Sequence, residues 1–175
     1  MRHTRFSRPL TWALGALLVL ALSACTVTIR SGESVGSDLP RSANPVIERF
    51  EVQGGEGANY RIGQRVRFQI RTRVEGHVTL TSMAPDGTVR VFARNLHVPA
   101  RRTVVLDGRE QGLSFTVGEM RGWHDVRASF TPSRTDVSRV TFRGRSGNAS
   151  WTAAIRLDLA PFDVRDVAEA RFFVR

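Results

Sequence analysis

The sequence predicts an all-β protein whose folded part is a single antiparallel sandwich or barrel. Apolar and polar residues alternate along several short segments from Val46 onward, which is the pattern of strands with one buried face. Turn-forming residues separate these segments, as at Pro85-Asp86-Gly87, where the glycine can adopt a positive φ. The chain shows no internal repeat and no heptad run, which argues against a solenoid or a coiled coil.

The clearest expected strand is Arg65–Val74, in which apolar residues share one face and arginines share the other. The apolar set is Val66, Phe68, Ile70 and Val74, and the arginines are Arg65, Arg67, Arg71 and Arg73. The other expected strands are Val46–Val52, His77–Met83, Thr88–Ala93, Arg102–Leu106, Leu113–Val117, Asp125–Phe130, Ser150–Leu159 and Ala168–Val174. A short helix is expected only around Thr135–Val140.

The composition divides the chain into three regions: a leader over residues 1–24, a tether over 25–45 and a folded domain over 46–175. The leader has a basic start with no acidic residue, followed by the apolar segment Trp12–Ala21. That segment is too short to span a bilayer, which takes about 20 apolar residues, and is typical of a secretion signal. The tether is rich in Ser, Gly, Pro and Asn, so it is expected to be flexible.

Leu22-Ser23-Ala24-Cys25 resembles the lipobox of bacterial lipoprotein precursors. The resemblance implies that Cys25 is acylated and becomes the N-terminus of the mature protein. Cys25 is the only cysteine, so no disulfide can form within the chain. Thr26, rather than Asp, follows the cysteine, which favours the outer membrane. The alternative is an ordinary secretory leader that is cut near Ala24.

The charge balance indicates an anionic partner. The net charge is +10, and all 26 basic residues are arginine. A basic domain of the cell envelope should be attracted to phosphorylated lipids, anionic glycans or acidic protein surfaces. Nucleic acid is a poor candidate for a lipoprotein outside the cytoplasm.

The segment Asn59–Pro99 resembles an uncharacterised bacterial envelope domain, a domain of unknown function found in secreted, kinase-linked and surface-layer-associated proteins. Tyr60-Arg61-Ile62-Gly63 matches the start of its pattern, and Asp86-Gly87-Thr88-Val89 matches its central turn. The family usually continues with a Phe-Pro-Asn-like element, where this chain has Phe92-Ala93-Arg94-Asn95. The resemblance implies an immunoglobulin-like β-sandwich that serves as an envelope or surface-layer accessory module.

The four arginines of the Arg65–Val74 strand are the candidate partner-binding face. They present forked donors to phosphate or carboxylate groups, with neighbouring side chains on the face about 7 Å apart. The alternative is a solvated outer face that nearby carboxylates neutralise. The residues available for that role are Glu51, Asp158 and Glu169.

The three histidines of the mature chain are the candidate metal ligands: His77, His97 and His124. Imidazole binds copper and zinc, so convergence of the three would support a copper-dependent, superoxide dismutase-like oxidoreductase. Asp86 and Asp125 are the available extra ligands, although Asp86 is better explained by its turn. The sequence lacks the His-x-His pair of those enzymes, so each histidine is more simply an exposed polar residue.

Other enzyme classes find no support in the sequence. It contains no Gly-x-Ser-x-Gly, no phosphate-cradling loop and no His-Glu-x-x-His. Trp123 and Trp151 would have to be exposed to bind glycans. No catalytic residue is assigned and no cofactor is expected. The sequence predicts a lipid-anchored binding or structural accessory that docks onto a surface-layer or outer-membrane assembly, and it leaves homo-oligomerisation open.

Overall fold

The computed structural model describes residues 44–109, 112 and 114–175. The leader, Cys25 and the tether before residue 44 lie outside these residues. The described part contains eight strands and one helix. In chain order they are β1 (Ile47–Val52), β2 (Ala58–Tyr60), β3 (Phe68–Thr72), β4 (Gly76–Met83), β5 (Val89–Val98), β6 (Thr103–Leu106), β7 (Gly122–Thr131), α1 (Asn148–Leu159) and β8 (Asp166–Val174).

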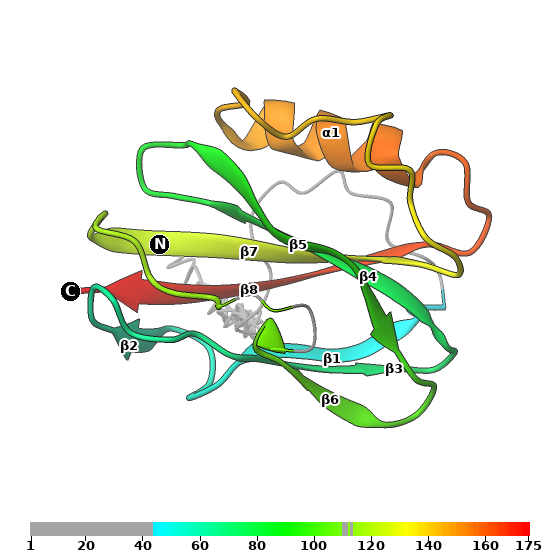
Figure 1. The fold of residues 1–175 in the computed structure, drawn as a ribbon, viewed down its shortest axis with the longest axis horizontal. Coiled ribbons are helices and arrows are strands. Elements are labelled where there is room, and N and C mark those ends of the chain that lie inside the picture. The colour runs from blue at the N-terminus through cyan, green and yellow to red at the C-terminus, as the bar shows by residue number, and fades with distance from the viewer. Residues whose placement is uncertain (1–43, 110–111, 113) are drawn as a thin grey trace, which may run out of the picture. The chain divides into compact units, whose positions relative to one another are not determined.

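The strands form two sheets, which confirms the predicted all-β class. The smaller sheet has the order β1-β3-β6, and the larger has the order β2-β8-β7-β4-β5. Figure 1 shows the two sheets as separate layers, with α1 lying over the larger one. All strand pairs are antiparallel except β2 and β8, which run parallel. The short strand β2 was not predicted.

The main core lies between the two sheets. Val66, Phe68 and Ile70 are buried there, as the alternation predicts, and they meet the inward side chains of the larger sheet. The same face continues with buried Thr72, whereas Val74 is 44% exposed, because β3 ends before it. The prediction that Val74 points into the core is therefore wrong.

A second core lies on the other face of the larger sheet, under α1. It joins the buried face of the helix to outward residues of the sheet and to the segment that precedes the helix. The polar side of this sheet is therefore buried as well, instead of facing water. The buried apolar residues are Val89, Val140, Phe142, Trp151, Ala154, Ile155, Leu159 and Val167.

The predicted strand Ser150–Leu159 is wrong, because this segment is the C-terminal part of α1. Its buried residues recur with helical spacing, and Ala153 and Ala154 favour a helix. The helix expected around Thr135–Val140 is also wrong, since this segment forms loops and a turn. The expected strand over residues 113–117 is reduced, where described, to a single bridge between Thr116 and Arg65.

The turn between β4 and β5 follows the prediction. Gly87 has a φ of 82°, a left-handed conformation that glycine adopts without the clash of a Cβ. Asp86 accepts hydrogen bonds from the backbone N–H of Thr88 at 2.8 Å and from its hydroxyl at 2.7 Å. These bonds hold the pKa of Asp86 below its ordinary value. The role assigned to Asp86 in the turn is therefore confirmed.

Both hydrophobic cores are formed by described residues between Val46 and Val174. The described residues contain no helix that is long and apolar enough to span a bilayer.

Candidate functional site

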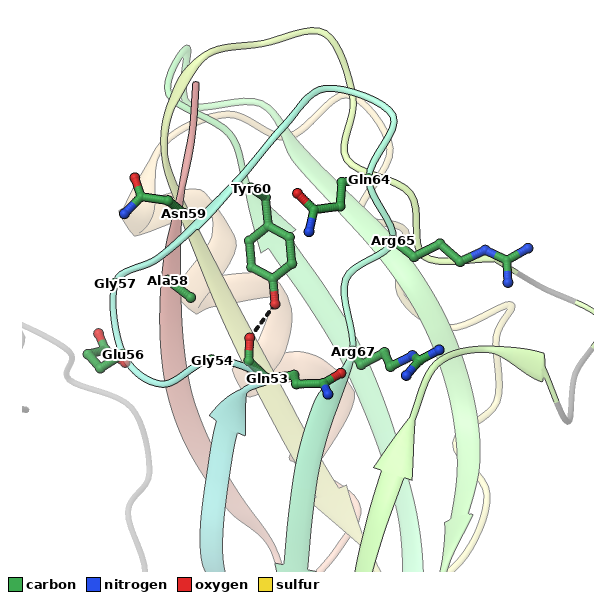
Figure 2. Close-up of a pocket in the computed structure, with 10 residues that line it drawn as sticks. All are labelled: Gln53, Gly54, Glu56, Gly57, Ala58, Asn59, Tyr60, Gln64, Arg65 and Arg67. Atoms are coloured by element: carbon green, nitrogen blue, oxygen red, sulfur yellow. Dashed lines mark hydrogen bonds between the residues drawn. The ribbon is translucent and has the colours of Figure 1, made fainter.

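A surface cavity of about 750 Å³ lies where β1, β2 and the segment before β3 meet. We call this end of the molecule the cavity end. Figure 2 shows how the loop after β1 and the turn after β2 surround the cavity. The residues that line it are Gln53, Gly54, Glu56, Gly57, Ala58, Asn59, Tyr60, Gln64, Arg65 and Arg67.

Tyr60 fixes the floor of this cavity. Its ring is 6% exposed and packs edge-on against Phe172, with ring centroids 5.4 Å apart. Its hydroxyl donates a hydrogen bond to the backbone carbonyl of Gln53, as Figure 2 shows. Burial raises the pKa of the Tyr60 hydroxyl, so it stays neutral and keeps donating at physiological pH. The tyrosine thus ties the loop after β1 to the turn after β2.

Backbone hydrogen bonds shape the glycine-rich loop that forms one wall. The N–H of Gly57 donates to the carbonyl of Arg171 at 3.0 Å, and that of Gln53 donates to the carbonyl of Arg67 at 2.8 Å. Gly54, Gly55 and Gly57 all have positive φ. The loop therefore forms a defined wall of the cavity.

Arg65 and Arg67 are the positively charged residues that line this cavity. Figure 2 shows both side chains extending toward the same side, whereas Glu56 lies across from them. No carboxylate among the described residues forms an ion pair with either guanidinium. Two forked donors side by side can bind one phosphate or carboxylate group through paired N–H···O bonds. Side-chain amides of Gln53, Asn59 and Gln64 add neutral donors nearby.

Arg71 and Arg73 are placed differently from the first two arginines. Arg71 forms an ion pair with Glu48 of β1, with an N···O distance of 2.8 Å. Arg73 donates weakly to the carbonyl of Pro45 at 3.4 Å. The structure therefore divides the predicted four-arginine face into a pair at the cavity and a pair with partners elsewhere.

The carboxylates that the sequence offers as neutralising groups do not serve these arginines. Glu51 pairs with Arg49 at 2.6 Å. Asp158 pairs with Arg94, and Glu169 pairs with Arg127; both pairs lie on the helix side of the larger sheet. Glu48, which does neutralise Arg71, lies at an irregularity in the register of β1, between Ile47 and Arg49, and Arg49 is the residue that pairs with Arg71.

His77 and His97 are cross-strand partners on β4 and β5, with ring centroids 5.8 Å apart. Nε2 of His97 lies 2.9 Å from a carboxylate oxygen of Glu75. The pKa of His77 is lowered, first by burial and then by the charges of His97 and Arg134, and Glu75 opposes this shift. His77 is therefore neutral at physiological pH.

The structure does not bring His124 to this pair. His124 lies near the start of β7, which ends at Thr131 beside His77. Its ring stacks on Phe172 at 5.2 Å, and its Nε2 lies 2.9 Å from the carbonyl of Met120. Across residues 44–109, 112 and 114–175, no group of three His, Cys, Asp or Glu side chains could hold a metal ion. The three-histidine copper site is therefore not assembled in this part of the chain.

The two tryptophans considered for glycan binding have different environments. Trp151 lies on the buried face of α1 and is 1% exposed, so it is a core residue. Trp123 is 45% exposed and packs edge-on against Phe173 at 5.3 Å. Arg171 lies over the ring of Trp123 at 4.8 Å and pairs with Asp125 at 3.2 Å. Asp125 is thus engaged in an ion pair.

A buried polar cluster surrounds Arg127, whose side chain is 4% exposed. The sequence did not predict this cluster. Its guanidinium pairs with Glu169 at 2.6 Å and lies 4.0 Å from the ring centre of Trp151. It also donates to Thr152 at 3.0 Å and to Asn148 at 2.7 Å. The cluster joins α1 to the sheet. The cluster could be predicted only if α1 was predicted first, because α1 covers the strand face that carries Arg127.

The comparison with protein families finds a match over a segment that includes the one on which the sequence resemblance rests. No curated protein and no solved structure matches the chain. The match to a family covers β2 through β7 except the first residue of β2, and it leaves out β1, α1 and β8. Residues 59–134 match the model of a domain of unknown function, DUF4384.

Proposed function

We propose that this chain is a lipid-anchored accessory protein of the cell envelope. In this proposal its immunoglobulin-like domain docks onto an anionic component of a surface-layer or outer-membrane assembly. The anchor is the acylated Cys25 of the lipobox-like sequence Leu22–Cys25. The function is binding rather than catalysis, and the binding group is the arginine pair at the cavity end.

The observation that carries the proposal is the state of Arg65 and Arg67. Both line the cavity, and neither has a carboxylate partner among the residues that the structure describes. A charged side chain that already has a partner must give it up to bind another. Arg65 and Arg67 do not face this cost, so an incoming phosphate or carboxylate has to displace water and not a protein carboxylate.

The position of the pair also favours docking over a structural role. Arg65 and Arg67 precede β3 and lie outside both hydrophobic cores. The domain can therefore keep its fold whether or not they are bound. The alternative of a copper-dependent oxidoreductase has no comparable support, because His124 lies apart from His77 and His97.

Charge reversal tests the proposal. The double variant Arg65→Glu/Arg67→Glu should bind isolated envelopes about ten-fold more weakly than the parent, because like charges then face the anionic partner. Binding of the parent should fall as salt rises, since about 0.1 M salt screens charges over roughly 10 Å. The measurement is co-sedimentation of Thr26–Arg175 with envelopes across a salt series.

The matched control is Arg49→Glu/Arg71→Glu, which changes the net charge equally on the same sheet. Both arginines already form ion pairs with carboxylates, so this variant should bind envelopes nearly as well as the parent. Neither double variant should lower the free energy of unfolding by more than about 0.5 kcal/mol per surface residue. Equal binding and equal salt dependence of the parent and Arg65→Glu/Arg67→Glu would overturn the proposal.

A further inference from the structure

The chain joins the folded domain at the end opposite the cavity, which we call the tether end. Just before β1, the carbonyl of Val46 accepts a hydrogen bond from the N–H of Arg73 at 2.9 Å. The N–H of Ile47 donates to the buried carboxylate of Asp166 at 2.8 Å. These bonds fix where the segment that carries Cys25 reaches the domain. From Arg73 to Arg67 the chain rises about 20 Å along β3.

Three loops at the tether end carry an excess of positive charge. They are residues 73–75, 99–102 and 132–134, which connect β3 to β4, connect β5 to β6 and follow β7. Their exposed arginines are Arg73, Arg101, Arg102 and Arg134, whereas Glu75 is their one carboxylate. Asp163 and Arg165, in the connection from α1 to β8, offset each other in charge.

Of these arginines, Arg101 and Arg102 are the ones best placed to bind an anion. No carboxylate in the described part of the chain pairs with either of them. Their loop is held in place, because the N–H of Arg101 donates to the carbonyl of Thr72 at 2.6 Å and Ala100 bridges Thr72. Arg101 has a φ of 57°, a left-handed conformation that glycine would adopt at less cost. Arg101 therefore places a guanidinium at a position whose backbone conformation favours glycine.

The tether places this charge close to a membrane. Cys25 lies 20 positions before Pro45. If this segment is the tether that its composition predicts, it would span about 25 Å on average. The loops nearest the point of attachment therefore spend most time nearest the surface that holds the acyl chains. Basic side chains close to an anionic leaflet are attracted to it. Each raises the ratio of bound to free protein about five-fold.

We propose that the tether end is a docking surface for the anionic lipid headgroups of the membrane that holds the anchor. This inference rests on the lipid anchor of the proposed function. The contact orients the domain, so that the cavity end with Arg65 and Arg67 faces away from the membrane and toward its partner. One end of the molecule then binds lipid while the other binds the envelope assembly.

Vesicle flotation of Thr26–Arg175, which lacks Cys25, tests this surface without any acyl chain. The protein should float at low salt with vesicles that contain phosphatidylglycerol and should stay behind with pure phosphatidylcholine. Arg101→Glu/Arg102→Glu should lower the ratio of bound to free protein by more than about 25-fold, the loss expected from removing two such charges. Arg101→Gln/Arg102→Gln, which removes the charge without reversing it, should fall between this variant and the parent. An unchanged thermal midpoint identifies the variants that keep the fold.

The control is Arg65→Glu/Arg67→Glu, which changes net charge equally at the cavity end. It should retain most vesicle binding, whereas its binding to envelopes falls about ten-fold, so failure of one proposal can be told from failure of the other. The inference would be overturned if the parent did not bind phosphatidylglycerol vesicles, or if reversal at either end reduced binding equally. It would also be overturned if Arg101→Glu/Arg102→Glu lost the envelope partner while keeping its vesicle binding.

Discussion

Trp151→Ala is expected to lower the free energy of unfolding by about 3–5 kcal/mol, the usual cost of truncating a buried tryptophan. Trp151 is 1% exposed at the centre of the core beneath α1. Its indole N–H donates to the hydroxyl of Thr81 at 2.9 Å, and Thr81 is itself fully buried. The substitution therefore leaves a cavity and removes the donor to a buried hydroxyl. Chemical denaturation followed by circular dichroism measures the loss.

Leu157→Ala is the control on the same helix. Leu157 is 57% exposed, so its truncation should change stability by no more than about 0.5 kcal/mol. If Trp151→Ala and Leu157→Ala had the same small effect, α1 would not pack on the sheet as described. A large loss in Trp151→Ala alone supports the second core.

Arg127→Ala is expected to lower the free energy of unfolding by about 3–5 kcal/mol, the usual cost of removing one member of a buried ion pair. The substitution removes the ion pair with Glu169, in which Nε of Arg127 lies 2.6 Å from a carboxylate oxygen. It also removes the hydrogen bonds that Arg127 donates to Thr152 and Asn148. It also removes the cation that lies over the ring of Trp151. Since these contacts join α1 to β7 and β8, helical circular dichroism should fall at lower denaturant concentration than in the parent.

Arg171→Ala provides a matched control one strand away. Arg171 also pairs with a carboxylate, that of Asp125, and also lies over a tryptophan ring, that of Trp123. Its side chain is 47% exposed, however, against 4% for Arg127. An ion pair in contact with water contributes about 0–1 kcal/mol, so Arg171→Ala should be mild. Similar losses in the two variants would mean that burial does not set the strength of the Arg127 cluster.

Most strands were predictable because one face of each is apolar. The alternation at Val66, Phe68 and Ile70 places these residues in the core of the structure. α1 was missed because its apolar residues fit two periods. Trp151, Ile155 and Leu159 lie on one face of a strand and also on one face of a helix. Burial of Ala154 and Asp158 distinguishes the helix from the strand, because it fits only the helical period. Burial of Asp158 could not be predicted without knowing that Arg94 forms an ion pair with it.

The candidate site was predictable in its residue types and not in their partners. Alternation alone places Arg65, Arg67, Arg71 and Arg73 on the outward side. Which of them is neutralised depends on the irregular β1–β3 register, which brings Glu48 to Arg71. The cavity depends on the path of the loop after β1, which is fixed by long-range hydrogen bonds to Arg67 and Arg171. Neither property can be deduced from the local sequence.

The lipid anchor is tested most directly by the mass of the N-terminal peptide of the protein isolated from native membranes. If Cys25 is the mature N-terminus, this peptide begins at Cys25 and carries the added mass of a diacylglyceryl group and a fatty acid. A Cys25→Ala variant should lack that mass and accumulate as an uncut precursor or as protein released from membranes. A native peptide that begins at Met1, or one cut near Ala24 with an unmodified cysteine, would contradict the account.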